Sequence, residues 1–160
     1  MARQMGFSRN DQKNEGRALG SEKIVVDTSV VIKWFKYRDE PYSEQAERLK
    51  ARYLNGEVEI AVPELIFYEL GNVLLLKCEL TEEEAVEKIE SFWKLLPIAV
   101  FLSAEFLRKI MSFSFKYEVT FYDACFAALA QELGCGFITA DKKLFDKLRD
   151  VKFVRFLGAP

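Results

Sequence analysis

The chain has 160 residues, of which 50% are hydrophobic, and this length and composition fit one soluble globular domain with a sizeable core. Its formal net charge of −2 is unlike the strongly basic balance that marks many nucleic-acid-binding proteins. The chain contains no histidine and no C-x-x-C pair, which excludes Ser-His-Asp triads, Cys-His pairs and histidine-bound zinc. Any metal ion must therefore be held by oxygen, and oxygen ligands favour Mg²⁺, Mn²⁺ or Ca²⁺.

The N-terminal part of the chain, residues 1–22, is polar and shows no hydrophobic period. Such a segment cannot bury enough apolar surface to offset the entropy of ordering, so we expect a flexible tail before a domain of residues 23–160. The start of the chain lacks the apolar segment of a secretory signal, and no stretch approaches the roughly 18 apolar residues of a membrane span. We therefore expect a cytoplasmic protein with no membrane partner.

From residue 23 onward, apolar runs that predict strands alternate with segments that predict helices. The predicted strands are residues 24–26, 58–62, 98–102, 136–139 and 152–157. The predicted helices are residues 28–35, 43–56, 63–76, 81–96, 103–115, 120–134 and 141–150. Continuous apolar strands alternating with helices are typical of parallel sheets covered on both faces. The sequence therefore predicts an α/β fold of three layers, a central parallel sheet of about five strands flanked by helices.

Residues with known capping preferences indicate where these helices start. Asp27 or Thr28 caps the first helix, and Pro63 opens the third at its first turn. The pair Thr81–Glu84 has the spacing of a capping box, and Thr120 caps the helix that ends before a glycine.

Four acidic residues interrupt segments that are otherwise apolar: Asp27, Glu69, Asp123 and Asp141. An ionised carboxylate in an apolar setting costs several kcal/mol unless a cation or hydrogen bonds compensate for it. A divalent metal ion is the simplest partner that all four could share. Asp27 and Asp141 directly follow predicted strands, and sites in such folds form outside the carboxyl ends of the strands.

Each of these acids also has a structural interpretation. Asp27 and Asp141 can simply cap helices, and Asp123 in the first turn of a helix gains from the helix dipole. Glu69 is expected about two turns into its helix, too far for an end effect, and only a solvent-facing turn would explain it. A capping carboxylate can also be a metal ligand, so the two interpretations remain open together.

Four motifs resemble the PIN-domain family when they are taken in order: VVDTS, PELIFYELGNVL, TFYDACFAALA and FITADKKL. The resemblance covers Lys23 to Phe156, and the compact single domain is similar to VapC-type toxins of toxin–antitoxin pairs. The N-terminal tail departs from the family, whose first motif usually lies close to the start. The resemblance implies a PIN-like nuclease domain, and it matches Asp27, Glu69, Asp123 and Asp141 to the family's acidic quartet, as catalytic residues and metal ligands. The residues matched to its neighbouring polar positions are Thr28, Ser29, Asn72 and Thr139.

The resemblance implies an endoribonuclease that depends on Mg²⁺ or Mn²⁺ and cleaves single-stranded or loop RNA, with an antitoxin protein as its partner. Carboxylate-bound metal can acidify a water and relieve charge on a phosphodiester, so the chemistry needs no histidine. Basic residues interleave with aromatic ones after the first acidic motif and follow the last one, a mixture that can hold RNA but that also occurs in cores and on solvated faces. These candidate RNA-binding residues are Lys33, Lys36, Arg38, Lys142 and Lys143.

Apolar residues around Leu65, Phe67 and Leu74, or around Phe92 and Trp93, exceed what one helix face buries. We therefore expect a homodimer. Two other functions remain open. One is a catalytically inactive PIN-like module that binds RNA or protein. The other is a metal-dependent phosphatase, although the haloacid-dehalogenase type would place a second Asp where Ser29 stands.

Overall fold

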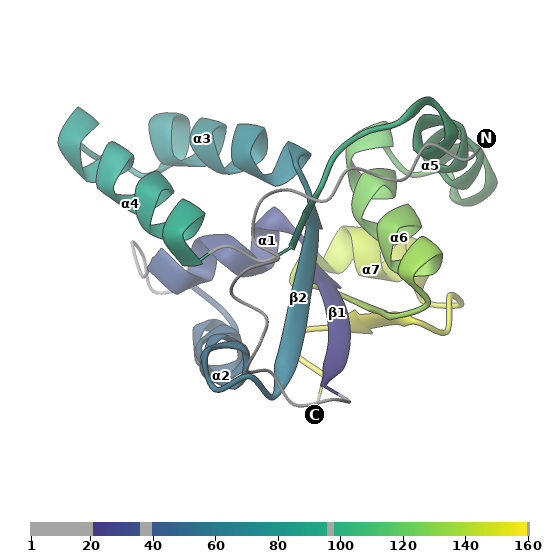
Figure 1. Cartoon of the computed structure of the whole chain (residues 1–160), viewed down its shortest axis with the longest axis horizontal. Coiled ribbons are helices and arrows are strands. Elements are labelled where there is room, and N and C mark those ends of the chain that lie inside the picture. Colours follow the sequence, from purple (N-terminus) through teal and green to yellow (C-terminus); the bar gives the residue numbers. More distant parts are fainter. Residues whose placement is uncertain (1–20, 36–39, 96–97, 160) are drawn as a thin grey trace.

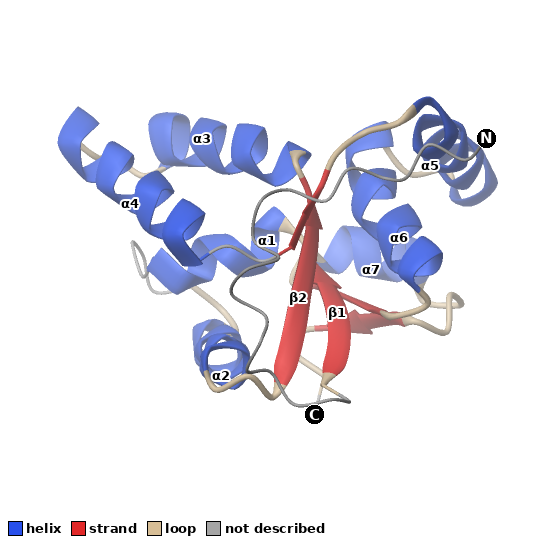
Figure 2. Cartoon of the chain, viewed as in Figure 1, coloured by secondary structure: helices blue, strands red, loops and turns tan. Residues whose placement is uncertain are grey.

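The computed structural model describes residues 21–35, 40–95 and 98–159. At its centre is a five-stranded sheet in the order β3-β2-β1-β4-β5, in which every neighbouring pair is parallel (Figure 2). The strands are β1 Glu22–Val26, β2 Val58–Pro63, β3 Ile98–Val100, β4 Gly136–Thr139 and β5 Val154–Phe156. The predicted parallel α/β fold is confirmed. Residues 1–20, most of the predicted tail, lie outside the described part of the chain.

The helices cover the sheet from both sides. Their bounds are α1 Thr28–Val31, η2 Ile32–Phe35, α2 Ser43–Leu54, α3 Leu65–Lys77, α4 Glu82–Leu95, α5 Ala104–Tyr117, α6 Phe121–Leu133 and α7 Lys142–Leu148. Figure 1 shows α1 and α2 on one side of the sheet and α5 and α6 on the other, while α3 and α4 form a pair that starts at the carboxyl end of β2. No helix in the described part of the chain is long and apolar enough to cross a membrane.

The core lies between the sheet and α6. This helix packs against β1, β2 and β4, and its residues 124–130 are all buried. Four of these seven residues are alanines, which allow the helix to lie close to the sheet. Because α6 packs against three strands, the position of Asp123 in its first turn is set by this packing.

The start of α3 differs from the prediction. Pro63 was expected in its first turn, but it is the last residue of β2, and the helix begins at Leu65. Pro63 pairs with Val100 of β3, and the hydrogen bond to the Val100 carbonyl comes instead from the N–H of Glu64, at 3.0 Å. Proline has no N–H to donate, so it is tolerated at the end of a strand where the next residue donates. Glu69 therefore lies about one turn, not two, into α3.

The predicted caps are present. The side chain of Asp27 caps α1, that of Thr120 caps α6 and that of Asp141 caps α7. The Thr81–Glu84 capping box is reciprocal, with backbone-to-side-chain bonds of 2.8 and 3.2 Å. The first predicted helix is α-helical only to Val31 and continues as a 3-10 helix.

Packing between α3 and α4 uses much of the apolar surface that was expected to be exposed. Leu74 and Phe92 are buried within the chain, and the ring of Phe67 lies 5.5 Å from that of Phe92 and 5.2 Å from that of Trp93. The prediction that Leu74 and Phe92 add to an exposed surplus is therefore wrong, because a sequence pattern cannot tell that two successive helices pack face to face. Trp93 remains exposed.

The N-cap of α5 offers a test of this local structure away from the sheet edge. The hydroxyl of Ser103 accepts the N–H of Phe106 at 3.1 Å, so Ser103→Ala should lower the free energy of unfolding by about 1 kcal/mol. Ser112→Ala, an exposed site inside the same helix, should be neutral or slightly stabilising. Urea unfolding measures both, and an equal effect of the two substitutions would contradict the cap.

Candidate active site

Asp27 and Thr139 lie side by side at the carboxyl edge of the sheet. Asp27 directly follows β1, and Thr139 is the last residue of β4. These strands are neighbours, with Val26 paired to Ile138. The position is the one where parallel sheets form their sites, as the sequence predicted for Asp27.

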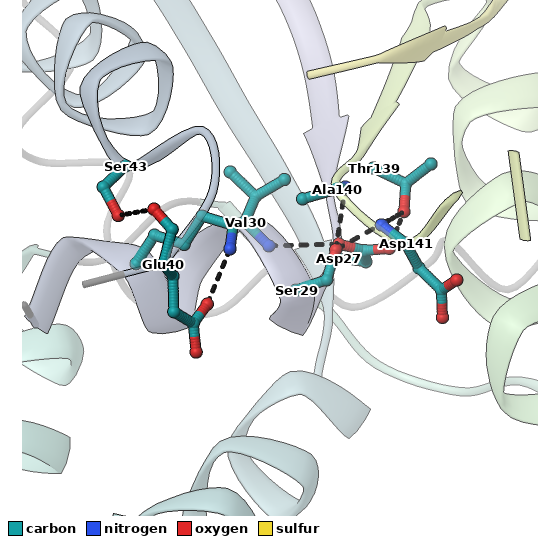
Figure 3. Close-up of polar contacts among 9 residues, drawn as sticks. Asp27, Ser29, Val30, Glu40, Ser43, Thr139, Ala140 and Asp141 are labelled. Atoms are coloured by element: carbon teal, nitrogen blue, oxygen red, sulfur yellow. Dashed lines mark hydrogen bonds and ion pairs between the residues drawn. The ribbon is translucent and has the colours of Figure 1, made fainter. Parts of the chain in front are cut away.

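The carboxylate of Asp27 is buried and is held by hydrogen bonds from neutral donors. Only 6% of the residue is exposed. Its Oδ1 accepts the Ser29 hydroxyl at 2.5 Å and the Val30 N–H at 3.3 Å, and its Oδ2 accepts the Thr139 hydroxyl at 2.5 Å (Figure 3). Burial, with a smaller contribution from the negative charge of Glu69, raises the pKa of Asp27 to about 6 even though these hydrogen bonds oppose the shift.

The two hydroxyl groups are themselves oriented by the backbone after β4. Ser29 Oγ accepts the N–H of Ala140 at 2.8 Å, and Thr139 Oγ1 accepts the N–H of Asp141 at 3.0 Å (Figure 3). A hydroxyl that accepts a backbone N–H still has its own proton to donate, and here the proton goes to Asp27. The loop between β4 and α7 thus sets the direction of both bonds to the carboxylate.

Glu69 extends this network from α3. Its Oε2 accepts the Thr28 hydroxyl at 2.6 Å. Burial raises the pKa of Glu69, the bond from Thr28 opposes the shift, and the charge of Asp123 raises the pKa again. Burial also raises the pKa of the Cys125 thiol to about 12, with further contributions from the charges of Glu69 and Asp123. Asp27, Glu69 and Asp123 are thus near enough to influence one another.

Asp123 lies in the first turn of α6 and forms a reciprocal pair with the capping residue. Its carboxylate accepts the Thr120 hydroxyl at 2.7 Å, and its N–H donates to the Thr120 oxygen at 3.1 Å. The structural role that the sequence allowed is therefore real. The side chain is nevertheless half-buried and close to Glu69, so it can serve both purposes.

Asp141 is more exposed than the other three acids. Its Oδ1 accepts the N–H groups of Lys143 and Leu144, at 2.8 and 3.1 Å, as expected of a cap. Thr139 joins it to the network, since the Thr139 oxygen bonds the Asp141 N–H on one side and Asp27 on the other. Thr139 therefore connects Asp141 to Asp27 through one hydrogen bond to each residue.

A cavity of about 550 Å³ opens between α1–η2 and α3. Glu69 and Asn72 line it from α3, together with Thr28 and Ser29. The remaining lining residues are Ile32, Lys33, Glu40, Val73, Leu76 and Lys77. Lys77 was not singled out from the sequence, although its spacing of eight residues from Glu69 places both on one face of a helix. The charged side chains of the cavity are therefore Glu69, Lys77 and the ion pair of Lys33 with Glu40.

The candidate RNA-binding residues differ in their surroundings. Lys33 is only 8% exposed and forms an ion pair with Glu40 at 2.6 Å, a partner that the sequence pattern did not indicate. Lys142 pairs with Asp146 and lies over aromatic rings, and Lys143 is exposed. Lys36 and Arg38 lie outside the described residues. Their predicted contact with RNA stays a prediction.

The oxygen donors of this site fit a magnesium-like ion. Within the described residues, no three Asp, Glu, His or Cys side chains come close enough together to hold one ion. Mg²⁺ is usually held by one or two carboxylates and keeps several waters, so it does not need three. Asp27 and Glu69 offer two partly or fully buried carboxylates, and no described cation contributes to lowering the pKa of either. A cation is the partner that such carboxylates lack.

The sequence of this chain matches a family model and a curated relative. A family model described as PIN domain matches residues 24–151. A relative named Ribonuclease VapC3, from Pyrobaculum aerophilum, is 33% identical over 129 residues, which cover 78% of this chain and 94% of the relative. The chain belongs to the PIN-domain family.

Solved structures agree on the fold of this PIN domain. A toxin–antitoxin complex from Klebsiella pneumoniae is similar with a TM-score of 0.65 at 13% identity, over 86% of this chain and 99% of that one. VapC20 from Mycobacterium tuberculosis, described as a sarcin-ricin loop cleaving toxin, is similar with a TM-score of 0.62 at 15% identity, over 80% and 95%. At these identities the likeness establishes the fold alone, whereas the family model and the relative from Pyrobaculum aerophilum confirm the resemblance to the PIN-domain family.

The buried carboxylate makes the stability of the metal-free PIN domain depend on pH. Because burial raises the folded-state pKa of Asp27 from 3.8 to about 6, the folded state binds the proton more tightly than the unfolded state. Tighter proton binding by the folded state adds to the free energy of unfolding. This stabilisation is fully present below about pH 4 and is lost as the pH rises through about 6, by up to about 3 kcal/mol. Burial of Glu69 acts in the same direction.

Asp27→Asn should remove most of this loss, so the substituted protein should gain stability relative to the wild type as the pH rises from about 4 to about 7. Urea unfolding at several pH values in EDTA measures the difference. Asp150→Asn, an exposed acid after α7, is the matched control and should follow the wild type. A constant difference between Asp27→Asn and the wild type across this range would contradict the buried titration.

Proposed function

We propose that this chain is a Mg²⁺- or Mn²⁺-dependent endoribonuclease that cleaves single-stranded or loop RNA and is the toxin of a toxin–antitoxin pair. The observation that carries the proposal is the buried Asp27 carboxylate. It accepts hydrogen bonds from the neutral hydroxyls of Ser29 and Thr139, and the charge of Glu69 acts on it. The relative named Ribonuclease VapC3 supports the reaction class. The expected cytoplasmic location belongs to the same proposal, because RNA is the substrate.

The residues divide the work of such a site. Asp27 and Glu69 are the proposed direct ligands, and Asp123 and Asp141 would act on the ion through its bound waters. A bound Mg²⁺ or Mn²⁺ would supply an acidified water and charge relief at the phosphate. Ser29 and Thr139 fix the rotamer of Asp27. Thr28 does the same for Glu69 through its 2.6 Å bond, and these hydroxyls keep the carboxylates in place when no cation neutralises them.

Cleavage of RNA tests the proposal directly. The purified protein should cut single-stranded RNA in Mg²⁺ or Mn²⁺ and stop in EDTA, because the carboxylates alone provide neither the nucleophile nor the charge relief. Asp27→Asn and Asp123→Asn should each lower the rate at least about tenfold, a loss of about 1.4 kcal/mol of transition-state stabilisation. Asp150→Asn, with the same change of charge at an exposed position after α7, should cleave like the wild type. Activity that survives both site substitutions, or persists in EDTA, would defeat the proposal.

The site also supports an antitoxin partner that blocks it with a cation. Asp27 and Glu69 are carboxylates without a described cationic partner, so an inserted Arg or Lys would form charge-assisted bonds there. One structural neighbour is described as a toxin–antitoxin complex.

Self-association is proposed as well, because Leu107, Met111 and Phe115 leave an exposed apolar stripe along α5.

Two measurements test these partners. Co-expression with the protein encoded by the adjacent reading frame should give a stable complex with reduced cleavage, and changing the antitoxin's inserted Arg or Lys to Ala should restore cleavage. A complex that cleaves as fast as the free protein would contradict the blocking cation.

Light scattering should show a dimer at micromolar concentration, and Met111→Lys should shift it towards monomer. A wild-type monomer under these conditions would contradict self-association.

A further inference from the structure

A second cavity, of about 560 Å³, lies on the other side of the first turns of α3. Aromatic side chains from three elements line it: Phe67 and Tyr68 from α3, Trp93 from α4 and Phe101 after β3. The carboxylates of Glu64 and Glu90 line it as well. Its volume is within the range of about 300–1,000 Å³ that small-molecule sites have, and its lining is mostly aromatic and aliphatic, with two carboxylates.

This cavity adjoins the candidate active site through consecutive residues of one helix. Tyr68 lines the aromatic cavity, and the next residue, Glu69, lines the cavity that contains Thr28 and Ser29. Successive side chains on an α-helix diverge by about 100°, which explains how neighbours face different cavities. Figure 1 shows the start of α3 at the carboxyl end of β2. If Glu69 holds the proposed divalent ion, an RNA strand whose phosphate lies at that ion would place a neighbouring base near Tyr68.

Three of the aromatic rings are exposed, and one of these has a supporting ring contact. Tyr68 is 69% exposed, Trp93 57% and Phe101 41%. The ring of Trp93 is nonetheless supported by Phe67, 5.2 Å away. Exposed rings held in place by a neighbour are the usual platforms on which unstacked nucleobases pack, because every base has an aromatic face.

Glu64 supplies a hydrogen-bond acceptor at the cavity wall. It precedes α3 and is half-buried, and its Oε1 accepts the N–H of Leu102 at 3.5 Å. Its Oε2 has no hydrogen-bond or ion-pair partner in the described part of the chain. Glu90 is exposed and pairs with Lys94, so it is less available. A carboxylate only accepts hydrogen bonds, and guanine is the RNA base with two adjacent N–H donors, N1–H and the 2-amino group, on its Watson–Crick edge.

We propose that this cavity binds an unstacked guanine of the RNA substrate next to the cleavage site. Trp93 and Tyr68 stack on the base, and the Glu64 carboxylate accepts hydrogen bonds from its N1–H and 2-amino groups. The proposal rests on the proposed ribonuclease function and adds a base preference to it. A pocket for one base explains how cleavage can be restricted to certain loops, because an unpaired guanine reaches the cavity and a paired one does not.

Binding can be measured without catalysis, because Trp93 is itself the reporter. The other tryptophan, Trp34, is buried, so quenching by a stacked base reports on Trp93. In EDTA, guanosine 5′-monophosphate should quench the fluorescence at concentrations at least about tenfold lower than the adenosine, cytidine and uridine monophosphates. Glu64→Gln should abolish this preference, and Tyr68→Ala should weaken the quenching of Trp93 by guanosine 5′-monophosphate. Leu54→Ala, which changes an exposed apolar residue at the end of α2, is the matched control and should bind like the wild type.

Equal quenching by all four nucleoside monophosphates would overturn the guanine pocket. The absence of quenching by any of them would also overturn it and would indicate that the cavity binds a protein partner instead. Cleavage provides the second arm. Replacing the guanine nearest the cut by inosine, which lacks the 2-amino group, should slow the wild type about tenfold and leave Glu64→Gln unaffected. RNA cleavage with no base preference would overturn the pocket while the ribonuclease stands. Guanine-selective quenching in a protein that cuts no RNA would support the pocket and defeat the ribonuclease.

Discussion

The buried carboxylate of Asp27 is the constraint on which the site depends. Removing an ionised carboxylate from water costs several kcal/mol, and the protein offsets this with two hydroxyl donors and one backbone N–H. These donors stabilise the charge without neutralising it, which leaves the carboxylate available for a cation. A salt bridge to Lys or Arg would have been a simpler solution for stability, and it would have removed that capacity.

The rest of the sheet edge is arranged around this residue. Ser29 and Thr139 reach Asp27 only because β1 and β4 are neighbours in the sheet, although 112 residues separate Asp27 from Thr139. Thr28, between Asp27 and Ser29, turns the other way and holds Glu69 of α3. Three consecutive residues after one strand therefore link α3, β4 and the loop before α7 into a single polar network.

Much of the fold and of the site could be predicted from local patterns. The caps at Thr81 and Thr120 require only residues within one turn, so their sequence signals were sufficient. Pro63 was misplaced because proline suits both a helix start and a strand end, and only the pairing with Val100 of β3 decides between them. The burial of Phe92 was missed for a similar reason, since its partner Phe67 lies on another helix.

The sequence by itself determined that Asp27, Glu69, Asp123 and Asp141 interrupt apolar segments, and the parallel α/β pattern placed the first of them at a strand end. Tertiary structure alone decided how they differ: Asp27 is buried, Glu69 and Asp123 are close to each other, and Asp141 is an exposed cap. The reason is physical. A side chain's identity is local, whereas its desolvation and its distance from other charges are set by strand order and helix packing, which bring together residues that are far apart in the chain.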